Sequence, residues 1–211
     1  MPIDAAKRCW SMSMTTRNDE PHILLKGKLV SLGPLQKSEV PFLTRWYNDP
    51  ITLLLGGDDL IPTSEARSEA LWTKFIEEEN DKRIFFTMYE KTSMRPIGMC
   101  NLRDINTLHG TGELGIIIGD AGDRGKGYGT ETVSLLVDYG FTAFGLTNIW
   151  LDTLSANIAA IRAYEKAGFK EIGRRRGSHR IGTRVYDTVL MDCIPADFYA
   201  LHESVIVNPY G

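Results

Sequence analysis

The chain has 211 residues, a length at which one domain can bury a sizeable core without disulfides or metals. Its formal net charge of −3 argues against a general nucleic-acid binder, whose surface would be basic. No stretch reaches the roughly 20 apolar residues of a membrane helix, and the start lacks the apolar core of a signal peptide. We therefore expect neither direct nucleic-acid binding nor membrane association.

The cysteines and histidines offer no pattern that would bind a metal. Cys9, Cys100 and Cys193 are odd in number and widely separated, and the four histidines are scattered along the chain. Metal sites and disulfide frameworks need closely spaced ligands or paired cysteines. The sequence predicts a reducing, cytoplasmic location and no bound metal.

Short runs rich in β-branched and apolar residues predict strands between turn residues. We expect residues 1–20 to be a flexible N-terminal extension and residues 21–211 to form a single domain. Within that domain the expected strands cover residues 24–32, 84–88, 96–102, 112–118, 149–153, 169–174 and 184–193.

Apolar residues at helical spacing predict four helices between these strands. The first covers residues 36–47 and is interrupted by Pro41, and the segment 53–62 after it is expected to be a loop. The other helices follow Thr63 or cover the ranges 126–144 and 157–167.

A glycine-rich turn, Arg124-Gly125-Lys126-Gly127-Tyr128-Gly129-Thr130, joins a predicted strand to a predicted helix. Glycines leave the backbone accessible, and the first N–H groups of a helix have no partner within it. Such a turn binds phosphate or diphosphate, since the helix dipole and nearby cations favour an anion there. Its glycine spacing fits neither the P-loop nor the dinucleotide-binding fingerprint, and Thr132 stands where a kinase-type loop would need glycine.

Four ordered segments resemble the GCN5-related N-acetyltransferase (GNAT) family. They are the strand 113–118, the Arg-x-x-Gly-x-Gly turn, the segment 157–169 ending in Tyr-Glu-Lys-Ala-Gly-Phe, and the strand 186–191. The residues of these segments are similar to those of the RimJ/RimL-like branch and of spermidine acetyltransferases. The resemblance implies an α/β (α+β) fold with a mixed, mostly antiparallel, twisted sheet of about seven strands flanked by about four helices.

The resemblance also implies acetyl-CoA as co-substrate and a role for each matched segment. Asn157 would contact the pantetheine arm, and Tyr164 would give a proton to the departing sulfur. Main-chain groups of the central strand would bind the arm and the acetyl carbonyl, at Ile116, Ile117 and Ile118. The diphosphate would lie on the turn, at Arg124, Gly125, Lys126, Gly127, Tyr128, Gly129 and Thr130.

Glu113 is the candidate base for the acceptor amine, eleven residues before Arg124 on the central strand. Strand alternation places it beside Gly115 and Ile117, an environment that could raise a carboxyl pKa. The alternatives are a solvated or salt-bridged strand glutamate, with an ordered water taking the amine proton.

We therefore expect acetyl transfer to a primary amine, which is a protein N-terminus, a polyamine or a small molecule. Residues 36–80 and 174–186 would form the acceptor pocket, where a dense acidic lining would favour polyamines and an open groove would favour peptides. The basic hairpin over residues 174–184 is expected to be solvated, and a homodimer is expected by resemblance alone. A CoA-binding sensor without turnover is the alternative from another class.

Overall fold

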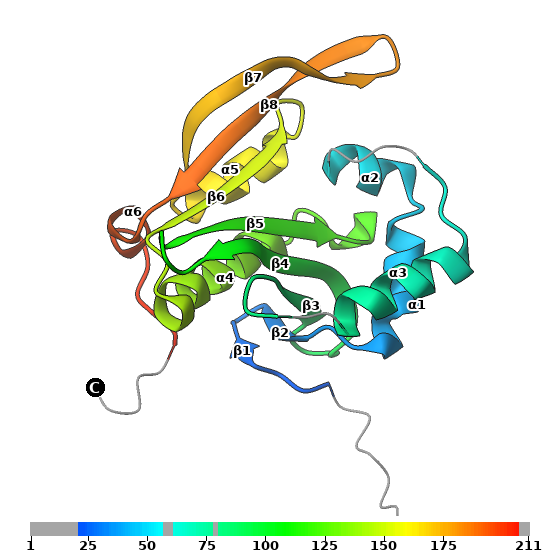
Figure 1. Cartoon of the computed structure of the whole chain (residues 1–211), viewed down its shortest axis with the longest axis horizontal. Helices are drawn as coiled ribbons and strands as arrows, with labels where there is room; N and C mark the ends of the chain where they lie inside the picture. The colour runs from blue at the N-terminus through cyan, green and yellow to red at the C-terminus, as the bar shows by residue number, and fades with distance from the viewer. Residues whose placement is uncertain (1–20, 57–60, 78–79, 207–211) are drawn as a thin grey trace, which may run out of the picture.

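The computed structural model describes residues 21–56, 61–77 and 80–206, so the expected flexible extension over residues 1–20 lies outside the described residues. The described strands form one open sheet in the order β1-β2-β3-β4-β5-β6-β8-β7 (Figure 1). Neighbouring strands are antiparallel except β5 and β6, which run parallel. The strands are β1 Leu25–Lys26, β2 Val30–Pro34, β3 Ile84–Glu90, β4 Pro96–Asn106, β5 Thr111–Ile118, β6 Asn148–Leu154, β7 Lys170–Ile181 and β8 Arg184–Cys193.

Six α-helices occur in the described part of the chain, together with the short 3₁₀ helices η1 and η2. In Figure 1 the first three α-helices gather beside one end of β4 and β5, while the β7–β8 hairpin projects away from the rest of the sheet. The helices are η1 Lys37–Glu39, α1 Val40–Trp46, α2 Pro50–Gly56, α3 Glu65–Glu77, η2 Ala121–Asp123, α4 Tyr128–Phe144, α5 Ile158–Lys166 and α6 Pro195–Tyr199. No helix of the described residues is long and apolar enough to cross a membrane.

The sheet separates two apolar layers because successive strand residues point to opposite faces. Leu114 and Ile116 pack into the larger layer with α4, whereas Ile117 packs into the smaller layer with Trp46 and Trp72. Each fully buried large apolar side chain contributes roughly 1.5–3 kcal/mol of transfer free energy, so both layers hold their helices against the sheet. This two-sided packing fixes the position of β5 in the middle of the molecule.

The structure confirms the expected α/β architecture and mixed sheet, with eight described strands where about seven were expected. The additional strand arises because the expected run 24–32 is divided between β1 and β2 by a turn at Gly27. The expected helix over 36–47 begins as η1, and Pro41 lies in the first turn of α1, where a missing N–H costs no bond.

The expected loop over residues 53–62 is wrong in its first part, because α2 continues through Gly56. Asp49 caps this helix: its carboxylate accepts the backbone N–H of Thr52 at 2.7 Å, and Pro50 begins the helix. The Asp-Pro pair therefore starts a helix rather than only ending the preceding one. Residues 57–60 of the expected loop lie outside the described residues.

Two further differences concern the C-terminal part. The strand expected at 169–174 extends to Ile181 as β7, so the basic residues of the hairpin lie mostly on strand rather than loop. Helix α6, which begins at a proline, was not expected; Phe198 anchors it in the larger apolar layer. The hairpin itself is exposed, and β7 forms one edge of the sheet.

Candidate functional site

The parallel strands β5 and β6 separate partway along their length. They pair only over Thr111–Glu113 and Asn148–Trp150, although β5 continues to Ile118. Beyond Trp150, β6 stays paired with β8 as far as Leu154, so the divergence opens on its β5 side. The later part of β5 therefore lacks a sheet neighbour along one edge, and a cavity lies at this split.

The direction of the unpaired main-chain groups on β5 follows from one hydrogen bond. The N–H of Gly119 donates to the carbonyl of Ile97 at 3.0 Å, so the groups of odd-numbered residues point toward β4. The groups of Leu114, Ile116 and Ile118 then point toward the split, whereas those of Ile117 pair with β4. Of the three expected isoleucines, Ile116 and Ile118 thus direct their main-chain groups into the split, where the carbonyl of Ile118 also accepts a hydrogen bond from Arg124 at 3.5 Å.

The glycine turn leads from η2 into α4 as the sequence predicts. Gly125 and Gly127 have φ of 77° and 87°, in the left-handed region that favours glycine. Gly127 is the N-cap residue of α4 and makes no side-chain capping bond, so the first N–H groups of the helix are available to a ligand. This helix end faces the cavity, whose wall includes Gly127, Gly129 and Thr130.

The two cations of the turn are held differently. Arg124 lies on the cavity wall and donates to the hydroxyl of Thr52 on α2 at 2.7 Å and to the carbonyl of Gly119 at 3.3 Å. Lys126 lies off the wall, 3.3 Å from the buried carboxylate of Asp123, whose pKa is lowered chiefly by its hydrogen bond from Arg95. Arg124 therefore joins the turn to α2, while Lys126 belongs to a neighbouring ion-pair cluster.

Asn157 caps α5 and also contacts α2 across the cavity. Its Oδ1 accepts the N–H of Ala160 at 3.2 Å, and its Nδ2 donates to the carbonyl of Leu55 at 3.0 Å. One amide thus fixes the start of α5 and the end of α2. The residue lies on the cavity wall, as its expected role requires.

Tyr164 is buried on α5 and also lines the cavity. Its ring packs against Phe169 with centroids 6.0 Å apart. Burial, and secondarily the charge of Asp152, raise the pKa of Tyr164 to about 12. The phenol therefore keeps its proton at neutral pH, the state that a proton donor needs.

Glu113 lies opposite Arg103 on the neighbouring strand and forms an ion pair with it. Glu113 is 7% exposed and lies off the described cavity wall, whereas Arg103 lies on that wall. The hydrogen bond to Glu113 raises the pKa of Arg103. Beside the small and apolar residues of its own strand, Glu113 thus has a guanidinium at the cross-strand position, as the salt-bridged alternative expects.

The cavity has a volume of about 620 Å³ and brings most of the expected site together. Among the expected residues, Glu113, Lys126 and Tyr128 lie off the wall that the described residues form. Those on it are Ile116, Ile117, Ile118, Arg124, Gly125, Gly127, Gly129, Thr130, Asn157 and Tyr164.

The wall also includes residues that sequence reasoning did not single out, among them Thr52, Leu55, Arg103 and Asp152. Thr52 and Leu55 belong to α2, whose capping Asp-Pro signal could have revealed the helix. Asp152 and Arg103 are polar residues on the sheet face that carries Glu113, and their positions there depend on the registers between neighbouring strands. Among the described residues there is no group of three or more His, Cys, Asp or Glu side chains arranged for a metal ion.

Comparisons with known proteins agree with this geometry. Residues 30–170 match the family model described as Acetyltransferase (GNAT) domain. A spermidine N(1)-acetyltransferase from Vibrio cholerae is 31% identical over 58% of this chain and 69% of its own length. Human alpha/beta-tubulin-N-acetyltransferase 9 is 29% identical over 71% of this chain and 76% of its own length.

Solved structures support the fold. A crystal structure of spermidine N-acetyltransferase from Vibrio cholerae, in complex with CoA and spermine, has a TM-score of 0.73 at 24% identity. The match covers 82% of this chain and 99% of that one, so the similarity extends over the whole acetyltransferase fold.

Proposed function

The chain belongs to the GNAT acetyltransferase family and is an acetyl-CoA-dependent N-acetyltransferase, and we propose that it transfers the acetyl group directly to a primary amine at the split between β5 and β6. The observation that most strongly supports this proposal concerns what borders the cavity. The free edge of β5, the uncapped end of α4 and the phenol of Tyr164 all border one cavity.

The residues present fit acetyl-CoA in three places. The open N–H groups at Gly127 and the following residues suit the diphosphate, because an anion there meets unpaired donors and the helix dipole. The main-chain groups of Ile116 and Ile118 suit the amide-bearing pantetheine arm, as an added strand would. Asn157 and Arg124 would lie along this path from their positions on the wall.

We propose that Tyr164 supplies the proton for the departing sulfur. The amine nitrogen bonds to the acetyl carbonyl carbon, and the C–S bond breaks with its electron pair going to sulfur. Tyr164 protonates that sulfur. The nitrogen then loses its second proton to the tyrosinate, which restores the phenol of Tyr164. The net reaction converts an ammonium and a thioester into an amide and a thiol, with one proton released to solvent.

The first amine proton has two routes, through Glu113 or through water. The ion pair between Glu113 and Arg103, and the position of the carboxylate off the cavity wall, favour water. In this proposal Glu113 is a positioning residue that holds Arg103 at the wall.

The decisive experiment is thiol release from acetyl-CoA across a panel of amines that includes spermidine and N-terminal peptides. We expect acetylation of at least one class, with product mass increased by one acetyl group. Tight CoA binding by calorimetry without turnover on any amine would contradict the proposal and support the CoA-binding sensor instead.

Three finer assignments are also proposals. The residues of the motifs support membership of the RimJ/RimL-like branch. The free, buried Cys100 and Cys193 support a reducing, cytoplasmic location. The exposed edge strand β7 supports pairing of two copies at the hairpin, which light scattering of the purified protein would test.

A further inference from the structure

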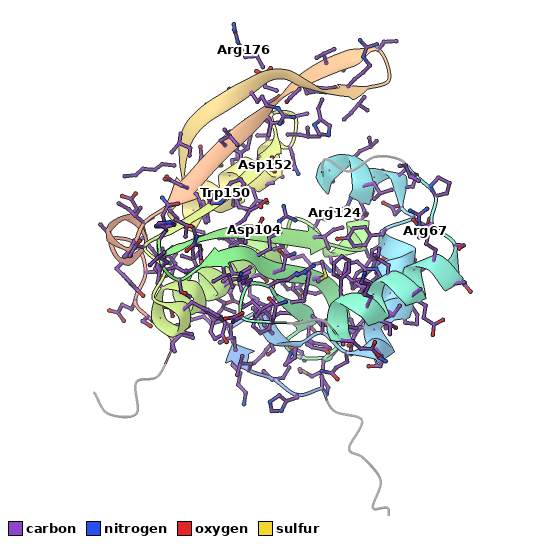
Figure 2. The ribbon with its side chains drawn as sticks, viewed as in Figure 1. Arg67, Asp104, Arg124, Trp150, Asp152 and Arg176 are labelled. Carbon is purple, nitrogen blue, oxygen red and sulfur yellow. The ribbon has the colours of Figure 1, made fainter. Side chains whose placement is uncertain are left out.

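Asp152 lies on β6 where the strand has left β5. Ile149 and Leu151 are buried against α4, so alternation places Trp150 and Asp152 on the opposite face, the face of Glu113. Figure 2 labels Trp150 and Asp152 on β6. The Asp152 side chain is exposed and lines the same cavity as Tyr164. The carboxylate therefore reaches the reaction cavity that Glu113 does not line.

Asp152 is the only carboxylate on the cavity wall that the described residues form. The other charged side chains of that wall are cations, at Arg103, Arg124, Arg162 and Lys166. These cations suit the phosphates of the co-substrate, but they repel an ammonium ion. A cationic acceptor thus meets one source of opposite charge on this wall.

The carboxylate is also uncommitted. Within the part of the chain that the structure describes, the side chain of Asp152 makes no hydrogen bond and no ion pair, in contrast to that of Glu113. Asp152, Tyr164 and Arg103 line the same cavity, and the charge of Asp152 contributes to the raised pKa of the other two side chains. An uncommitted acid beside the proton donor is available to bind a substrate.

We propose that Asp152 binds the ammonium group of the acceptor and holds its nitrogen beside Tyr164. This inference rests on the proposed acetyl transfer and adds the charge of the substrate class, an amine that is protonated near neutral pH. When the acceptor fills the cavity, the ion pair loses water and becomes stronger than an exposed salt bridge. Asp152 then selects and orients the amine, and the proton routes described above remain unchanged.

The test compares Asp152→Asn with wild type in the full chain, using the best amine of the panel. Because asparagine removes the negative charge that faces the ammonium group, we expect kcat/KM for the amine to fall at least about tenfold. KM should carry most of that loss, and the dissociation constant of CoA should stay unchanged. Asp152→Glu, which keeps the charge, should restore much of the affinity for the amine.

Asp104→Asn is the matched control, because Asp104 is an exposed acid near Arg103 that lies off the cavity wall (Figure 2). Asparagine also tolerates its φ of 49°, so this variant should behave as wild type. A weakly basic amine that is neutral at the assay pH, such as 2,2,2-trifluoroethylamine, should lose little activity with Asp152→Asn.

The outcomes separate this inference from the proposed function. Absence of turnover by wild type on every amine would overturn acetyl transfer itself. Normal turnover by wild type and an unchanged amine KM in Asp152→Asn would overturn only the role of Asp152. Equal losses for charged and neutral amines, or weaker CoA binding, would show that Asp152 acts on the fold or the co-substrate instead.

Discussion

Two regions border the cavity, and the sequence encodes them differently. The turn from β5 into α4 depends on backbone conformations that only certain residues adopt, as the left-handed Gly125 and Gly127 show. The α1–α3 region instead depends on contacts distant in sequence, such as Arg124 with Thr52 and Asn157 with Leu55. The first region has a motif that the sequence shows directly, whereas the contacts of the second are set by the fold.

This difference matches the roles that we propose for the two regions, acetyl-CoA binding by the first and acceptor binding by the second. Acetyl-CoA presents the same diphosphate and amide-bearing arm to every enzyme that uses it, so main-chain groups in a fixed geometry can bind it. An acceptor is bound by side chains, which can vary while the fold persists. Perturbing the two regions should therefore give different kinetic signatures.

Tyr164→Phe should have the largest effect, since it removes the proton donor without opening a cavity in the core. We expect kcat to fall about 10²- to 10⁴-fold with little change in CoA affinity. Because the pKa of Tyr164 is raised to about 12, its ionisation should not reduce the activity of wild type below about pH 11. Steady-state kinetics against pH measure kcat, and calorimetry measures the affinity for CoA. An unchanged kcat would remove Tyr164 from the proposed mechanism.

Gly125→Ala should act next most strongly, and on CoA binding rather than on the amine. A Cβ at Gly125 meets open space, so the cost is backbone strain at its φ of 77°, about 1–2 kcal/mol. We expect the dissociation constant of CoA to rise about tenfold. Gly122→Ala is the matched control, because a Cβ there also meets open space and no left-handed φ is required. Equal effects of the two substitutions would contradict binding through the turn.

The sequence could predict the local structure around the proposed acetyl-CoA site because its signals there are local. Glycines at positive φ, a capping Asn157 and the terminal Gly168 with its φ of 102° each constrain a few neighbouring residues. The ion pair of Glu113 could not be read in this way, since its partner Arg103 depends on the register between β4 and β5. The same holds for Asp152, whose position in the cavity requires β6 to part from β5.

Asn157 makes one bond to the start of α5 and one to the end of α2 through different atoms, so substitutions can separate the two bonds. Asn157→Ala loses the helix cap and the bond to Leu55, so we expect the free energy of unfolding to fall by about 1 kcal/mol. Asn157→Asp keeps a capping oxygen but no longer donates to Leu55. We expect near-normal stability in urea and a KM for the amine raised about 3- to 10-fold, as α2 loses its tether. Equal destabilisation by both variants would show that the bond to Leu55, and not the helix cap, carries the stability, which would contradict this prediction.

Glu113→Gln should have the smallest effect if Glu113 only positions Arg103. The partner guanidinium is 47% exposed, so water compensates for much of the lost ion pair, and glutamine still accepts a hydrogen bond. We expect kcat/KM to fall less than about tenfold and the unfolding free energy to fall by less than about 1 kcal/mol. A catalytic base would instead cost about 10²-fold or more in kcat, with the loss of an acidic limb in the pH profile. Because the same assay applied to Tyr164→Phe gives the scale of a lost proton donor, the ratio of the two losses decides between water and Glu113 as the acceptor of the amine proton.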